Sequence, residues 1–561
     1  LYAVGGGDAL ARVSATASPD DIGALTDSLT SALLRQIWRG GRAPSPVLGD
    51  VATSSNEALR AFLRGESYFE RWIPDTAEME YRRAAQLDSN FAQAWMRINL
   101  VRGLAAIPAD TMVNRRLLEL IDRLPQRDQD LVRYSTTPMP TLTRYERAKE
   151  LADRYPDYHT AVYRAGDIPV HAGPRVGIPV SDAWPYIERL DSIAPQNADN
   201  AQHRWFVALS LGDTAQMLRG LRDMVARSPS TTWAQGNLRI AEAVMRTGEL
   251  PSARDLLPYF EIAKQFRAEI AQMTGGAQML AAPPLTVGPT HREVLDLLSR
   301  DPAYAFLHRL LPLARATAEF STGNARKALQ QFEEVAGSPN TPAWRASVFR
   351  AAATAGWLGL ISRGVGDAQV ARARQRVPLD SLGAQAFTAH WAEGIAAIVR
   401  GDSARLERAA AAMLDTSANR QLQVRGLRAL WRERRTGKID SLVAYEDEAM
   451  QTARFFSPAV PLHRVAIGRA LVRAGDPGRA EHYLQWYDGF PVDEAPILSR
   501  ELGWVFSAYE RGIAAEARGD TRGAILQLQR VVRWIDQPST ELKPMVDDAR
   551  RRLDRLLAAR R

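Results

Sequence analysis

The sequence predicts an all-α protein, an α-α superhelix built as a solenoid of helical hairpins, with a short α/β segment at its N-terminus. Three observations predict this class. A chain of 561 residues is too long for one ordinary globular core. Small residues recur at fixed distances from large apolar ones, at spacings that suit paired helices. Runs of alternating β-branched residues, which indicate strands, are nearly missing.

The first fifty residues differ from the rest of the chain. Residues 11–17 are expected to form a strand, and the helix that follows has Ser18 at its N-cap and Pro19 in its first turn. A single strand-helix unit cannot bury its strand edge. We therefore expect residues 1–50 to be the end of an α/β domain that begins upstream of Leu1.

The clearest hairpin is "ALRAFLRGESYFERWIPDTAEMEYRRAAQLDSNFAQAWMRI", residues 58–98. Gly65 is followed twelve residues later by Ala77, and then by Tyr81 and Ala84. Small residues let two helix backbones approach closely, and large side chains fill the space around those contacts. The spacing therefore predicts two antiparallel helices in close contact.

The same spacing returns near the C-terminus. Gly468 is followed twelve residues later by Ala480, and Gly512 by Ala524. Partial copies, each with a glycine in the expected turn between two helices, occur in "AVMRTGELPSARDLL" and "AEFSTGNARKALQQFEEV". Glycine at such a turn allows a helix to end in the left-handed conformation.

These residues resemble the tetratricopeptide repeat, in which small, aromatic and alanine positions recur within a unit of 34 residues. The resemblance implies a solenoid whose concave face is lined by the first helix of each hairpin and binds proteins or peptides. The stretches "RLPQRDQDLVRY" and 154–197 also resemble large bacterial repeat regions that follow Ser/Thr kinase or winged-helix DNA-binding domains. This second resemblance covers roughly residues 10–260, and the kinase's own motifs are absent.

Two stretches rich in Gly and Pro, 171–185 and 272–291, interrupt the helical pattern. The second contains Pro283, Pro284 and Pro289 and cannot form one continuous helix. The expected organisation is a partial α/β segment at 1–50, an N-terminal array at 51–271, a loop at 272–291 and a C-terminal array at 292–561.

The residues that carry chemistry in enzymes are missing or isolated. The chain has no cysteine, and none of its eight histidines has the helical spacing of a zinc site. No nucleophile elbow, phosphate-binding loop or calcium loop occurs. His171, soon after Asp167, is the most site-like histidine, but a structural role is the preferred interpretation. Tryptophans within helical stretches, such as Trp357, are interpreted as core. We expect no enzyme, no catalytic residue, no cofactor and no metal.

The net charge of +8 and the pI of about 9.7 do not indicate a nucleic-acid partner, because the cations are spread along the chain and interleaved with acids. The densest cluster, "DDARRRLDRLLAARR", is interpreted as a final amphipathic helix rather than an anion-binding tail. There is no apolar run of 18 residues, so no transmembrane segment is expected. The compartment of this bacterial-type chain stays open: cytoplasmic, or extracytoplasmic if a leader or anchor precedes Leu1.

The function predicted from this fold is a non-catalytic scaffold, possibly a subunit of a larger assembly, that binds a protein or peptide partner. The alternative is a sensory or regulatory region of a larger signalling protein, a kinase or a transcription regulator. The expected groove residues are Phe62, Glu66, Phe69, Val465, Arg469, Arg473, Tyr509 and Glu516. Arg469 and Arg473 lie four residues apart and are placed to hold a carboxylate of the partner, although a solvated helix face is the competing interpretation.

Overall fold

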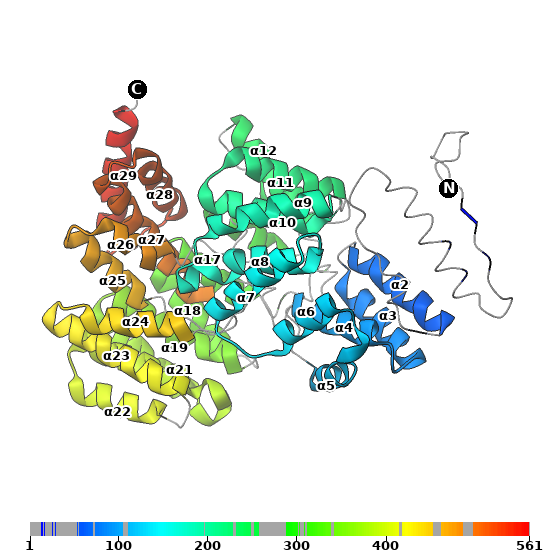
Figure 1. Cartoon of the computed structure of the whole chain (residues 1–561). Coiled ribbons are helices and arrows are strands. Elements are labelled where there is room, and N and C mark those ends of the chain that lie inside the picture. The colour runs from blue at the N-terminus through cyan, green and yellow to red at the C-terminus, as the bar shows by residue number, and fades with distance from the viewer. Residues whose placement is uncertain are drawn as a thin grey trace. The chain divides into compact units, whose positions relative to one another are not determined.

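The structure is a computed structural model of the chain. It describes residues 13–14, 16, 25, 29, 53, 55–70, 73–104, 110–195, 197–227, 232–247, 252–256, 288–300, 302, 308, 311–337, 342–414, 418–452, 462–485 and 497–559. Every regular element in these residues is a helix, and no strand occurs among them (Figure 1). The described part of the chain is therefore an all-α array.

The chain divides into two units by its internal contacts. The first unit comprises residues 1–139, 143–167 and 183–203, and the second comprises 140–142, 168–182 and 204–561. The boundaries of these two units do not coincide with those of the two arrays expected from the sequence, at 51–271 and 292–561.

The helices that lie wholly or mainly in the first unit are α2 (Asn56–Glu70), α3 (Pro74–Leu87), α4 (Ala92–Leu104), α5 (Thr111–Glu119), η2 (Ile121–Arg123), α6 (Gln126–Thr136), α7 (Thr141–Arg154), α8 (His159–His171) and α9 (Trp184–Ile193). Helix α10 (Ala198–Leu211) begins in the first unit and continues into the second.

The helices of the second unit are η3 (Gly173–Val176), η4 (Val180–Ala183), α11 (Thr214–Arg227), α12 (Thr232–Thr247), α13 (Ala253–Leu256), α16 (Gly288–Arg300), α17 (Leu311–Ser321), α18 (Ala325–Gly337), α19 (Pro342–Leu358), α20 (Arg363–Arg376), η7 (Leu379–Gln385), α21 (Ala386–Arg400), α22 (Ser403–Met413), α23 (Ala418–Thr436), α24 (Asp440–Thr452), α25 (Leu462–Arg473), α26 (Pro477–Leu484), α27 (Ile497–Ala517), α28 (Thr521–Trp534) and α29 (Lys543–Ala558).

The hairpins form as the small-residue spacing predicts. A Cβ atom built at Gly65 of α2 would lie 2.5 Å from the Tyr81 ring of α3. At Gly468 of α25 it would lie 2.6 Å from the Leu484 side chain of α26. In both hairpins the large side chain follows the glycine by sixteen residues and occupies the space that a Cβ would need. The two helix backbones therefore approach more closely than any other residue would permit.

The predicted Gly-Asp turns are also confirmed. Gly475 and Gly519 have φ values of 80° and 74°, in the left-handed region. The aspartate after each glycine caps the next helix: Asp476 accepts a hydrogen bond from the Arg479 backbone N–H, and Asp520 accepts one from the third residue after it. One dipeptide thus ends the first helix of a hairpin and begins the second.

The expected N-terminal α/β segment lies almost wholly outside the described residues. Of the predicted strand at 11–17, Val13, Ser14 and Thr16 are described, and none of them belongs to a strand. In the helix expected to follow, the described residues Leu25 and Leu29 are helical.

The predicted breaks differ from the structure at their edges. His171, assigned to the first break at 171–185, is instead the last residue of α8, and two short 3-10 helices follow it. The second break at 272–291 is described only from Gly288, where α16 begins. Pro289 lies in the first turn of that helix, where a missing backbone N–H leaves no hydrogen bond unmade.

The C-terminal array of hairpins closes on itself. Helix α27 packs against its neighbours α25 and α26, as a solenoid requires, but it also packs against α17 and α19 from the start of the array (Figure 1). A solenoid hairpin ordinarily contacts only the hairpins next to it in sequence. The extra contacts therefore bring the first and last hairpins of this array together.

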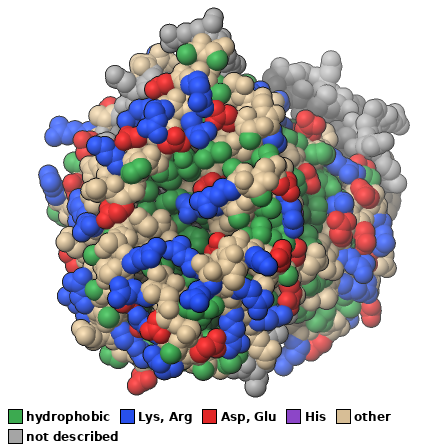
Figure 2. All heavy atoms as spheres, turned by 90° about the vertical axis from the view of Figure 1, so that its left-hand side faces the viewer, with side chains coloured by type: hydrophobic (Ala, Val, Ile, Leu, Met, Phe, Trp, Pro, Cys, Tyr) green, Lys and Arg blue, Asp and Glu red, His purple; other side chains and the backbone are tan. Residues whose placement is uncertain are grey.

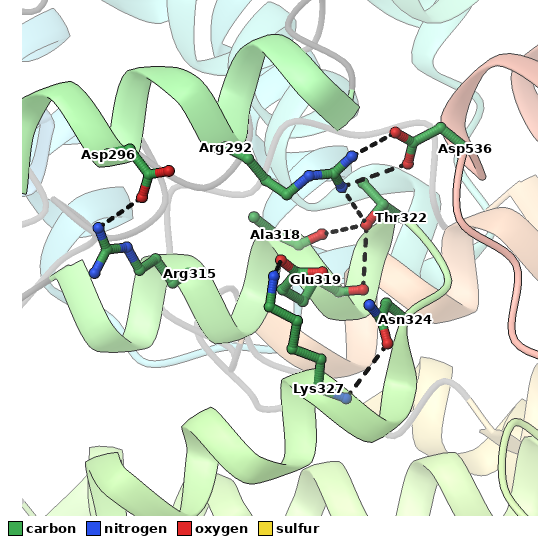
Figure 3. Close-up of polar contacts among 9 residues, drawn as sticks. All are labelled: Arg292, Asp296, Arg315, Ala318, Glu319, Thr322, Asn324, Lys327 and Asp536. Atoms are coloured by element: carbon green, nitrogen blue, oxygen red, sulfur yellow. Dashed lines mark hydrogen bonds and ion pairs between the residues drawn. The ribbon is translucent and has the colours of Figure 1, made fainter.

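Polar contacts at the start of the array hold the segment that follows α28 (Figure 3). Arg292 of α16 donates to the Asp536 carboxylate at 2.5 Å and to the Thr322 hydroxyl at 3.1 Å. The backbone N–H of Gln537 donates to the Thr322 carbonyl, and that of Ser539 to the Gly323 carbonyl, at 3.3 and 3.1 Å. The bonds made by Asp536, Gln537 and Ser539 join residues more than two hundred positions apart.

Two first helices of the closed array, α21 and α25, contain stretches that are buried on every side. Residues Leu462 to Gly468 of α25 are all buried, and seven consecutive residues cover two turns of a helix. In α21, residues Gly394 to Val399 are likewise all buried. A helix that lined an open groove would leave one face exposed. The inner face of this array is thus part of its core.

The close helix contact gives a direct test in α25 and α26. Gly468→Ala places a Cβ against Leu484, so we expect a loss of about 1–3 kcal/mol in the free energy of unfolding. Gly478→Ala in the same hairpin is the control, because a Cβ there meets no atom within 4 Å. The control should be neutral or more stable by up to about 1 kcal/mol, since alanine favours helix. Equal effects in urea unfolding would contradict the packing account.

Candidate partner-binding site

A strip of polar and aromatic side chains begins on the first helices of the first unit. Arg97 of α4 donates to the Glu66 carboxylate of α2 at 2.7 Å, and the Tyr81 hydroxyl donates to the other oxygen of that carboxylate at 2.5 Å. The Arg97 guanidinium also lies over the Phe69 ring, 5.9 Å from its centroid. The Arg97 and Glu66 side chains are 21% and 26% exposed, so solvent reaches both partners.

The strip continues to α6 and to the start of α8. The Tyr158 hydroxyl donates to Asp128 at 2.6 Å, and the Arg127 guanidinium lies 5.2 Å from the centre of the Tyr158 ring. Burial, reinforced by the Asp128 carboxylate, raises the pKa of Tyr158. Burial alone would lower the pKa of Arg97, but the charges of Glu66 and Asp128 outweigh it, so the net pKa is raised. Both side chains keep their ordinary charge state at neutral pH.

Helix α8 carries the last part of the strip. His159 at its first turn lies 3.3 Å from the Asn200 amide oxygen and stacks on the Tyr163 ring at 6.0 Å. Burial lowers the pKa of His159, which keeps its imidazole neutral at pH 7. We call the set Glu66, Phe69, Arg97, Asp128, Tyr158 and His159 the polar strip.

Beneath the polar strip lies a buried ion pair that the sequence did not indicate. His203 of α10 is 4% exposed, and its Nε2 lies 3.4 Å from the Asp167 carboxylate of α8. Its Nδ1 lies 2.9 Å from the Asp199 backbone carbonyl. Burial opposes the charged imidazole, but the Asp199 and Asp167 carboxylates outweigh burial and raise the pKa of His203 to about 9. The imidazole is therefore charged at neutral pH and joins α8 to α10.

His and Asp side chains also ligate metals, so the pair has a second chemical interpretation. A metal requires a deprotonated ring nitrogen, and the raised pKa of His203 opposes that state. Two carboxylates lie near His203. Asp199 is four residues before it on the same face of α10, whereas Asp167 lies on α8, 36 residues away in the sequence. No local spacing in the sequence therefore indicates the contact between Asp167 and His203.

The predicted groove residues of α2 fall in two places. Phe62 is 7% exposed and packs between the rings of Tyr81 and Phe91, with centroids at 5.6 and 5.0 Å. Glu66 and Phe69 belong to the polar strip. The structure thus brings two of the three predicted α2 residues to one accessible surface.

The predicted groove residues of α25 are divided between core and surface. Val465 is fully buried. Arg469 donates to the Glu510 carboxylate at 2.7 Å and lies over the Phe506 ring, so it already holds a carboxylate of its own chain. Arg473 is exposed in the last turn. Its role in partner binding stays a prediction.

The predicted groove residues of α27 face the C-terminal helix α29. The Tyr509 hydroxyl donates to Asp548 at 2.8 Å, and Glu516 accepts a hydrogen bond from Arg552 at 2.6 Å. Arg555 pairs with the same carboxylate. The basic C-terminal cluster therefore supplies the partners of Glu516, and it forms the predicted amphipathic helix with Leu553 buried.

His171, the most site-like histidine of the sequence, is a buried residue at the end of α8. Its ring meets the Phe206 ring edge to face, with centroids 5.9 Å apart. This packing contact agrees with the structural role preferred from the sequence.

Charge is mixed on the surface that Figure 2 presents. Lys and Arg side chains there lie among Asp and Glu side chains rather than in one separate patch. Pairs such as Arg428 with Glu407 and Arg425 with Glu448, each with N–O distances of 2.6 Å, are exposed examples. Among the described helices, none has the length and apolar character to cross a membrane.

Comparison with known proteins adds little to this geometry. No family model matches the sequence, and no curated protein matches it. One matching solved structure is the crystal structure of the P58(IPK) TPR domain, at 13% identity over 79% of this chain and 98% of that chain. The TM-score of that match is 0.19, a value too low to support an argument. The description as a hairpin array resembling tetratricopeptide repeats therefore rests on the helix pairs themselves.

The buried His203 pair predicts a dependence of stability on pH. Its pKa is raised from 6.5 in the unfolded chain to about 9 in the folded one. The stabilisation, at most about 3 kcal/mol, is therefore complete below pH 6.5 and is lost as the pH rises through 9. Hydrogen exchange of α8 and α10 between pH 7 and 10, corrected for intrinsic rates, measures this loss. His203→Gln should remove the extra dependence, and an unchanged profile would contradict the charged pair.

Proposed function

We propose that this chain is a non-catalytic scaffold that binds a protein partner along the polar strip of the first unit. The observation that carries the proposal is the partial exposure of a charged and aromatic strip on consecutive first helices of hairpins. In tetratricopeptide-like arrays these helices line the surface that faces a partner. The first helices α21 and α25 of the C-terminal array have buried inner faces, and Arg464 of α25 already donates to the Pro174 and Arg175 carbonyls, which favours the first unit as the docking surface.

The chemistry of the strip suits a protein surface rather than a small substrate. Arginine and aromatic side chains contribute most to protein interfaces, because they bury large areas and form directional hydrogen bonds. Arg97 is central here, since Glu66, Phe69 and the Tyr158–Asp128 pair surround it. These contacts hold the guanidinium in place before a partner arrives, which lowers the entropy lost on binding.

Site-specific photocrosslinking tests the location of the surface. A photoreactive phenylalanine analogue at Phe69, introduced in the source organism's cells, should give a discrete crosslinked product. The same analogue at Met79 of α3, which is 59% exposed but outside the strip, is the control. Crosslinking from Met79 equal to that from Phe69 would contradict the proposed surface.

The partner identified in this way provides a second test. Arg97→Gln should weaken its binding by about tenfold or more, because a charge-assisted contact is lost. Arg147→Gln is the matched control, since Arg147 is 64% exposed and, among the described residues, pairs only with Glu150 of its own helix. Circular dichroism of both variants should match that of the unmodified protein. Equal affinities of the two variants would refute the assignment of the strip.

A further inference from the structure

Among the residues that the structure describes, Arg350 of the closed C-terminal array has no counter-charge. Helix α19 is buried from Ala346 to Ala355 except at Arg350, which is half-buried. No residue that the structure describes accepts a hydrogen bond from Arg350 or forms an ion pair with it. Burial accordingly lowers the pKa of Arg350 to about 10, and no carboxylate acts in the opposite direction.

Two other shielded arginines of the same array pair with carboxylates. Arg405, with a side chain 22% exposed, pairs with Asp367 and Glu393. Arg464, with a side chain 6% exposed, donates to Glu446 at 3.0 Å. A shielded charge without such a partner costs folding free energy. Arg350 therefore differs from these two arginines, which have carboxylate partners.

Two further hydrogen-bond donors lie on the same side of α19. Thr354 and Trp357 follow Arg350 by four and seven residues, a spacing that places all three side chains on one helix face. Thr354 is fully buried, and its hydroxyl has no hydrogen-bond partner in the described structure. Trp357, interpreted as core from the sequence, is only half-buried, and no described residue accepts its indole N–H.

We propose that this face of α19, formed by Arg350, Thr354 and Trp357, binds an oxyanion. A guanidinium, a hydroxyl and an indole N–H are three donors, and no carboxylate of the described residues pairs with any of them. A carboxylate or a phosphate would supply the missing charge, and the planar guanidinium can hold two of its oxygens at once. The site lies in the second unit and is separate from the polar strip, so it does not depend on the proposed partner surface.

The test compares thermal unfolding of the full chain in chloride, inorganic phosphate and succinate at equal ionic strength, with calorimetric titration of each oxyanion. We expect a saturable rise in Tm of the unmodified protein with at least one of the two. Arg350→Gln should abolish that rise. In chloride it should be no less stable than the unmodified protein, because an uncompensated charge has been removed.

Arg345→Gln is the matched control. It removes the same charge from the same helix, but Arg345 lies five residues before Arg350, about 140° away around the helix. Binding by this variant should equal that of the unmodified protein. Thr354→Val, which keeps the side-chain shape, is the second test variant and should weaken binding severalfold while the fold is retained.

The outcomes separate the sources of the anion. Saturable binding of phosphate alone assigns a phosphate site, and binding of succinate alone assigns a carboxylate site. Two results would overturn the proposal. One is anion binding that survives in both Arg350→Gln and Thr354→Val, and the other is an equal Tm of the unmodified protein in chloride, phosphate and succinate.

Discussion

The close approach of two helices at a glycine is the contact on which the rest of this structure depends. In the α25–α26 hairpin the Leu484 side chain occupies the space beside Gly468. The α27–α28 hairpin repeats the arrangement with Leu528 against Gly512. Each contact fixes the separation of the two helices, and hairpins of equal shape can then stack in register. Stacking buries much of the first helices. If the array is sufficiently curved, its last hairpin can also contact its first, as α27 contacts α17 and α19.

Closure decides which surfaces remain for function. Helix α27 packs against α17 and α19, and inner side chains of the C-terminal array such as Val465 belong to the core. The polar side chains that remain shielded there must be paired or must await a ligand. Arg405 and Arg464 are paired with carboxylates. Arg350 has no such pair among the described residues, and its face of α19 is the proposed anion site. The polar strip of the first unit stays partly exposed instead, with its charges already oriented.

The hairpins were predictable from the sequence because their determinants are local. Gly65 and Tyr81, or Gly475 and Asp476, lie within one hairpin, so spacing alone reveals them. Closure could not be predicted, because the pair Arg292–Asp536 spans 244 residues and no short pattern encodes it. The candidate site was predictable in part. The repeat register assigned Glu66 and Phe69 to the surface of α2, and both side chains are partly exposed there. It could not reveal that Arg97 of the next hairpin would pair with Glu66.

Closure of the C-terminal array is what favours the first unit as the proposed docking surface, and an electron-spin distance measurement tests this closure most directly. The chain has no cysteine, so labels can be attached at cysteines introduced for Gln330 of α18 and Thr540 before α29. These exposed positions lie near the ion pair between Arg326 and Glu541, whose N–O distance is 3.0 Å. A closed array predicts one short, narrow distance distribution. A long or broad distribution would show an open array and would contradict the account.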